Sequence, residues 1–179
     1  MCEKFAFIFE KTNFIFCNTK EELQKMSEIN KFKFTKEIFT PTVRFRLLES
    51  GIIQYTYLLD SEVNDKEHQI NHNTLLDFVK DYMNPAQKVL ILVNSEGFNS
   101  ISPEARKLIR ELEKIVPILS RAIVITSLNE RLLANFYITF NKPIIPTKIF
   151  KNYSEAIEWL LKSEQDFKQS VLKIDLTIK

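Results

Sequence analysis

Glycine is scarce in this chain, which has only two glycines, Gly51 and Gly97, among its 179 residues. An average chain of this length would contain about a dozen. The two glycines stand far apart, and neither GxxxxGK(S/T) nor GxGxxG occurs. Because both patterns cradle phosphates on glycine-rich backbone, the sequence excludes the two commonest nucleotide-binding loops. No other motif indicates a cofactor, so we predict that the protein has none.

Cysteine and long apolar runs are also scarce. Both cysteines, Cys2 and Cys17, lie near the N-terminus, whereas a disulfide framework would spread cysteines through the domain. No run approaches the roughly 18 apolar residues of a transmembrane helix, so we expect no membrane span. Residues 1–11 carry acidic side chains and lack a small-residue cleavage site, unlike a signal peptide. These absences predict a cytoplasmic protein.

An excess of charge of one sign is missing as well. The chain has 25 basic and 23 acidic residues, a net charge of +2, and the two signs are interspersed. A nucleic-acid-binding surface normally needs a concentrated basic patch or arm. We therefore expect no nucleic-acid partner.

No group of residues forms a catalytic signature. His68 and His72 are four residues apart on a predicted helix, but no third ligand of a zinc pattern stands near them, which favours a structural role. No serine lies in a GxSxG motif, and Cys17 lies in an apolar run away from both histidines. The sequence therefore predicts no catalytic residues, no metal site and a protein that is not an enzyme.

Three parts of the chain differ in their patterns. Residues 1–40 are rich in phenylalanine, and we assign them to an N-terminal extension of short strands and a helix. Residues 41–165 have clear strand and helix periodicities and form the main domain. In residues 166–179 apolar and polar side chains alternate, which is typical of an edge strand with one buried face, or of a tail.

The main domain is predicted to be α/β. Gly51 lies in a turn between two apolar segments, which indicates a hairpin. Apolar runs at 88–93 and 122–126 are typical of strands buried on both faces, and 147–150 is a further short strand. The order β-β-α-β-α-β-α-β-α predicts a mixed sheet with an N-terminal hairpin, parallel central strands and about four helices. Each helix is expected to follow an Asn or Ser cap: Asn64, Ser102, Ser127 and Asn152.

Residues 94–102 form the most informative connection. They leave the carboxyl end of a predicted central strand and enter a predicted helix at Ser102. Ligands and partners bind at this edge in open α/β sheets, and a helix N-terminus favours an anion, including a phosphate on Ser100 or Ser102. The alternative is an ordinary capped loop in which Ser102 only satisfies the helix end. An exposed Phe98 would suit contact with a protein.

The arrangement resembles the STAS domain in its SpoIIAA-like and SEC14-related branch, over roughly residues 41–163. Four segments carry the resemblance: Gly51-Ile52-Ile53, residues 101–106, residues 122–125, and the closing Phe150 to Leu160 with Glu155, Ala156 and Trp159. It implies a small α/β sheet with helices mostly on one face. In STAS members of the anti-sigma-factor-antagonist type, the loop and helix after the third strand bind partner proteins. It also implies a phosphorylated serine at that helix start, here Ser102 or Ser100. The family's Asp-Ser-Ser-Gly stretch is replaced by residues 99–103.

Two functions compete. The leading hypothesis is a non-enzymatic, STAS-like regulatory or scaffolding module that binds a protein partner, with serine phosphorylation as a subsidiary switch. The alternative is a carrier of a small apolar ligand of SEC14-like type, suggested by Phe136, Tyr137, Phe140 and Trp159, which core packing also explains. The residues expected to bind the protein partner are Ser95, Phe98, Asn99, Ser100, Ser102 and Arg106.

Overall fold

The computed structural model describes residues 32–58, 61–84, 87–95, 98–101, 114–125 and 143–177, together with Lys107, Asn135 and Ile138. The chain divides into two compact units, residues 1–33 and 34–179. Every helix and strand given below belongs to the second unit. The short strands and helix predicted before residue 32 lie outside the described residues.

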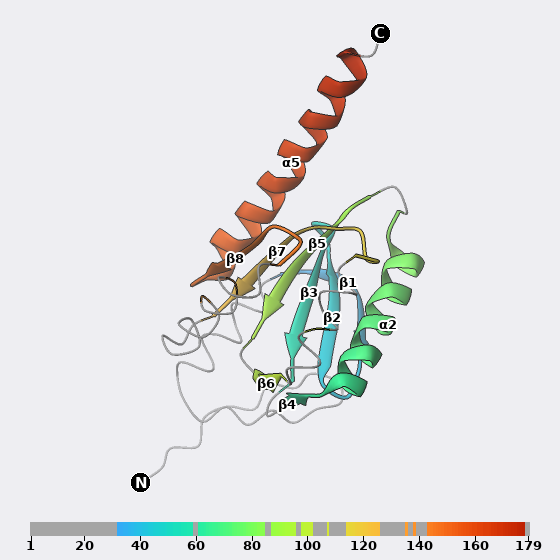
Figure 1. The fold of residues 1–179 in the computed structure, drawn as a ribbon, viewed down its shortest axis with the longest axis vertical. Coiled ribbons are helices and arrows are strands. Elements are labelled where there is room, and N and C mark those ends of the chain that lie inside the picture. Colours follow the sequence, from blue (N-terminus) through green and yellow to red (C-terminus); the bar gives the residue numbers. More distant parts are fainter. Residues whose placement is uncertain are drawn as a thin grey trace. The chain divides into compact units, whose positions relative to one another are not determined.

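A six-stranded mixed sheet forms the centre of this unit (Figure 1). Its order is β1-β2-β3-β5-β7-β8. The first three strands pair antiparallel, and β3, β5, β7 and β8 pair parallel, as the predicted hairpin and central strands require. The bounds are Phe34–Phe39, Val43–Leu48, Ile52–Tyr57, Val89–Asn94, Ile118–Val124 and Thr147–Phe150.

Strand β1 corrects the predicted domain boundary. The sequence pattern places residues 34–39 in an extension that ends at residue 40, but they pair with β2 from Phe34↔Leu48 to Phe39↔Arg44. The boundary between the two units lies between residues 33 and 34. The alternation in these residues is weak because all six are exposed, so neither face of the strand has a strong apolar signal.

The first helix and the hairpin are positioned by two features that the sequence predicts, a helix cap and a turn glycine. Helix α2, Asp65–Tyr82, begins at Asn64, whose side chain accepts from the Glu67 amide at 3.1 Å while the Glu67 carboxylate accepts from the Asn64 amide at 2.9 Å. This reciprocal capping box satisfies two otherwise unpaired amides. In the hairpin, Gly51 has φ +82° and donates its amide to the Leu48 carbonyl. Both predictions are confirmed.

The two described helices cover opposite faces of the sheet. Helix α2 packs Leu75 and Phe78 against Phe45 and Ile53, and these four side chains are buried. The sheet register places Phe150 on the other face, where Trp159 of helix α5 packs against it with ring centroids 5.6 Å apart. Helix α5 contacts β5, β7 and β8.

Helix α5 spans Tyr153–Thr177, so the predicted edge strand in residues 166–179 is wrong over the described part of that segment. Alternation over the eight residues 171–178 does not exclude a helix, because the same residues also form a partial apolar stripe at helical spacing. No proline or glycine interrupts residues 153–177, and an established helix extends at little cost through Lys, Glu, Gln and Leu. Its last turns carry exposed apolar side chains, including Leu172 at 62% exposure.

Two further strands form a small separate sheet. Strand β4, Ser61–Val63, pairs parallel with β6, Phe98–Ile101. The sequence predicts a connection at residues 94–102 and no strand at residues 61–63. Figure 1 shows β4 and β6 near the arrowhead of β3, at the edge where the parallel strands end.

The count of helices agrees only in part with the expectation of about four. Two helices have described bounds, α2 and α5. The helices predicted from Ser102 and Ser127 fall mainly outside the described residues, although Lys107, Asn135 and Ile138 are helical. Strand β7 begins at Ile118, four residues before the predicted start, because the chain becomes extended directly after Pro117. The α/β class and the mixed sheet are confirmed.

Candidate functional site

Ser95 lies where strand β5 ends, as the sequence predicts. Its hydroxyl donates to the Val124 carbonyl at 3.2 Å, which joins the carboxyl ends of β5 and β7. The preceding residue, Asn94, is buried at 3% exposure. Ser95 therefore has a structural hydrogen bond at this edge of the sheet.

The backbone of Phe98, Asn99 and Ser100 forms most of strand β6. Phe98 pairs with Ser61 and Ser100 pairs with Glu62, with an irregularity between them. Because β4 follows β3 and β6 follows β5, the pair is formed by two chain segments that leave neighbouring strands at their carboxyl ends. The structure thus brings three predicted partner-binding residues to the same edge as Ser95. Ser102 and Arg106 lie outside the described residues.

A polar cluster lies at the N-terminal half of α2, around Asn71. Its side-chain oxygen accepts from the Thr40 hydroxyl at 2.6 Å, and its amide nitrogen donates to the Thr42 hydroxyl at 2.9 Å. Asn71 is 1% exposed, so these bonds replace the water it loses on folding. This arrangement anchors the helix to the residues just before β2.

His68 and His72 lie on the inward side of α2, where burial affects both imidazoles. Burial, followed by the charges of His72 and Arg121, lowers the pKa of His68 to about 4, while Asp65 opposes this shift. Burial also lowers the pKa of His72. Among the described residues no group of three or more His, Cys, Asp or Glu side chains could hold a metal. The structural role predicted for the two histidines is consistent with this environment.

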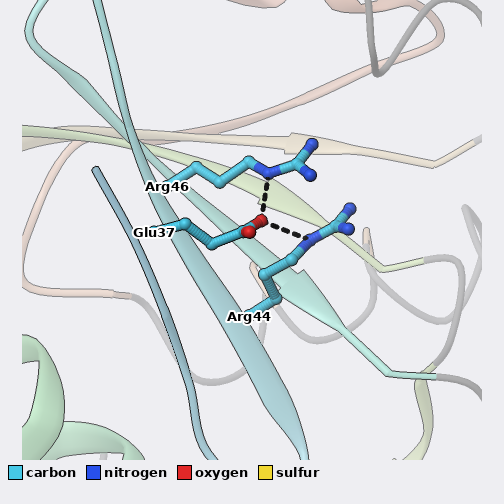
Figure 2. Close-up of polar contacts among 3 residues, drawn as sticks. All are labelled: Glu37, Arg44 and Arg46. Carbon is cyan, nitrogen blue, oxygen red and sulfur yellow. Dashed lines mark hydrogen bonds and ion pairs between the residues drawn. The ribbon is translucent and has the colours of Figure 1, made fainter. Parts of the chain in front are cut away.

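A second polar group, missed by the sequence analysis, lies on the sheet face opposite α2. We call Glu37, Arg44, Arg46, Gln54 and Thr56 the polar sheet face. The register pairs Glu37 with Arg46, Arg46 with Gln54, and Arg44 with Thr56, so all five side chains point to one side. The Glu37 carboxylate contacts Arg46 Nε at 2.5 Å and lies 3.8 Å from Arg44 Nε (Figure 2).

Burial distinguishes this group from an ordinary solvated strand face. Arg46 is 3% exposed and Gln54 is 1% exposed. Neither atom of the Gln54 amide, nor the Thr56 hydroxyl, has a hydrogen-bond partner among the described residues. The signal in the sequence is the strict alternation of polar and apolar residues over 43–47. Such alternation predicts that the polar side of a strand faces solvent, so it does not reveal that this side is buried.

Comparisons with known proteins place the chain in a family. Residues 47–164, more than half of the chain, match the family model described as "Domain of unknown function (DUF7793)". No curated protein and no solved structure matches the chain. In the parts of the chain that the structure describes, none of the helices combines the length and apolar character needed to cross a membrane. The chain therefore belongs to the family described as Domain of unknown function (DUF7793).

Proposed function

We propose that this protein is a non-enzymatic regulatory or scaffolding module that binds a partner protein through residues 95–106. The observation that carries the proposal is the position of β6, which includes Phe98, Asn99 and Ser100. Among the described strands, β6 pairs with β4 alone, so its other edge has no described strand beside it. Such an edge can accept an extended segment of a partner as an added strand.

The sheet order supports a STAS-like assignment for this module. A hairpin leads into parallel strands that lie side by side in the order of the sequence, β3-β5-β7-β8. Right-handed crossovers between such neighbours place their connections on one face. The STAS resemblance implies this architecture, and in that family the loop and helix after the third strand contact the partner. Counted within the six-stranded sheet from the hairpin strand at residue 43, that third strand is β5, and the segment that follows it contains β6.

Phosphorylation of Ser100 or Ser102 is a subsidiary part of the proposal. A phosphate adds between about one and a half and two negative charges at pH 7, which would alter contact with a partner at this edge. Ser95 is a poor candidate because its hydroxyl is used in the bond to Val124. Intact-mass analysis of protein from native cells tests the switch. Absence of added phosphate under every growth condition would contradict it.

The cytoplasm is the compartment that we assign to this function. Only two cysteines occur, both before residue 18, which suits a reducing environment. The apolar-ligand alternative gains no specific support, because Trp159 packs against the buried Phe150 ring. The other three aromatic residues, Phe136, Tyr137 and Phe140, lie outside the described residues.

Affinity capture with a double variant tests the proposed interface. The full chain carrying Phe98→Ala and Arg106→Ala is compared with the natural sequence as bait. The matched control is Leu172→Ala with Lys173→Ala, which removes one exposed apolar and one exposed basic side chain from helix α5. We expect a protein that the natural bait and the control retain and the interface variant loses. If every retained protein binds all three baits equally, the proposal is wrong.

A further inference from the structure

The last part of helix α5 extends beyond the sheet that supports its first part (Figure 1). The helix contacts β5, β7 and β8, and Phe167 is half-buried beneath Lys88, whose amino group lies 4.7 Å from the centre of the Phe167 ring. From residue 168 onwards, every residue whose burial is described is exposed. At 1.5 Å per residue, residues 168–177 form a helical projection about 15 Å long.

The apolar stripe with which α5 packs on the sheet continues along this projection. Ala156 and Leu160 are fully buried. Phe167 and Val171 follow Leu160 at intervals of seven and four residues, which keeps all three on one side of the helix. Val171 is 41% exposed, and the next residue at helical spacing is Ile174. The sheet-facing side of α5 is therefore still apolar beyond its described contacts with the domain.

The residue types of the projection also favour a neighbour. Val171, Ile174 and Thr177 are β-branched, and such residues form helices less readily than the Lys, Glu and Gln residues that precede them. Helical turns without tertiary packing are marginal in water, because most helical stability in proteins comes from burial of an apolar side. Burial of this stripe against a second helix would stabilise the projection.

The order of charges along the projection indicates which helix that would be. Lys168 and Asp175 occupy positions seven residues apart, on the same flank of the stripe, and the other flank has Ser163, Ser170 and Thr177. In an antiparallel pair, each flank meets the same flank of the other helix. Two copies of this chain would then place Lys168 of each opposite position 175 of the other, and the two-fold symmetry forms this complementary pair twice. A parallel pair would bring the charged flank against the hydroxyl flank instead.

We propose that residues 167–177 form a dimerisation surface, which packs antiparallel on the same residues of a second copy of this chain. Phe167 and Val171 supply the apolar contact, and Lys168 pairs with Asp175 of the second copy. A contact of so few turns is smaller than a standard interface, so the dimer dissociates on dilution. The surface is on a different part of the chain from residues 95–106, and the dimer would present two copies of that segment.

Sedimentation equilibrium of the full chain, from micromolar to near-millimolar concentration, tests the apolar contact. Val171→Glu introduces a charge on the stripe. Its matched control is Leu172→Glu, because Leu172 is also apolar and is 62% exposed but lies about 100° further round the helix. Glutamate forms helices more readily than valine, so Val171→Glu cannot weaken the dimer by lowering helix propensity.

A charge exchange tests the antiparallel orientation. Lys168→Asp opposes like charges across the dimer, and Lys168→Asp with Asp175→Lys restores opposite charges. Both variants lose the contact of Lys168 with Glu164 in the same helix, at 2.9 Å, so the difference between them reports the contact between copies.

We expect the average mass of the natural sequence and of Leu172→Glu to rise with concentration towards that of a dimer. Val171→Glu should raise the dissociation constant by about tenfold or more, because each dimer loses two apolar contacts and would bury two charges. Lys168→Asp should also raise it, and the double variant should lower it again. A chain that is monomeric at every concentration overturns the proposal. Equal weakening by Val171→Glu and Leu172→Glu, or no recovery in the double variant, also overturns it.

Discussion

Acidification should destabilise this protein chiefly through His68. The imidazole lies on the inward side of α2, and burial lowers its pKa from 6.5 to about 4. The positive charges of His72 and Arg121 act in the same direction, and Asp65 at the helix start opposes them. The folded protein therefore keeps His68 neutral at a pH where the unfolded chain protonates it.

The size of the effect follows from the difference between the two pKa values. Above pH 6.5 His68 is neutral in both the folded and the unfolded chain, so its full contribution to the free energy of unfolding is present. As the pH falls towards 4, the unfolded chain gains a proton that the folded chain does not. At 1.36 kcal/mol per pKa unit, the loss is about 2 kcal/mol at pH 5 and approaches about 3 kcal/mol below pH 4.

Urea unfolding at pH 8 and pH 5, followed by circular dichroism, measures this loss. His68→Gln keeps a polar side chain of helix-forming type but cannot titrate, so it should lose about 2 kcal/mol less than the natural sequence between the two pH values. His72→Gln is the control and should retain most of the dependence. The chain has only these two histidines, so the pH dependence that remains in the double variant comes from the carboxylates. Equal pH dependence in the natural sequence and His68→Gln would refute the reasoning.

Changes at three further positions test the fold by urea unfolding. Asn64→Ala removes the capping box and should cost about 1 kcal/mol, and no loss would mean that the cap contributes nothing. Leu160→Ala, at a fully buried position of α5, should cost about 2 to 5 kcal/mol, and a loss below about 1 kcal/mol would contradict its core position. Gly51→Ala should cost about 1 kcal/mol through its positive φ alone, because nothing lies within 4 Å of the added Cβ. Gly51→Asn should cost less, and the reverse order would contradict this explanation.

Local signals explain why part of the fold could be predicted. Strand β8 matches its predicted bounds, and α2 begins at the predicted cap, because a short apolar run and a capping box are each encoded within a few residues. The hairpin follows from Gly51, which adopts the positive φ that its turn requires.

Non-local interactions explain the elements that the sequence did not reveal. Strands β4 and β6 are short and join residues more than thirty positions apart, and no local pattern encodes such a pairing. The C-terminal residues alternate like a strand but continue α5, because the preceding helix and the absence of a breaker outweigh a short pattern.

The candidate sites were predictable to different degrees. Position along the sheet could be inferred for Ser95 and for residues 98–100, because loops after parallel strands meet at the carboxyl edge. The polar sheet face could not be inferred, because Arg46 and Gln54 alternate with apolar residues as solvent-facing side chains do, and their burial depends on packing against that face.

Site-specific photo-crosslinking tests the proposed partner interface most directly. A photoreactive residue replaces Asn99 in β6, and the same residue at exposed Leu172 of α5 is the control. We expect a discrete heterologous crosslinked product from Asn99 in native cells, diminished when Phe98→Ala and Arg106→Ala are added, and absent from Leu172. Identical products from the two positions, or none from Asn99, would contradict partner binding through residues 95–106.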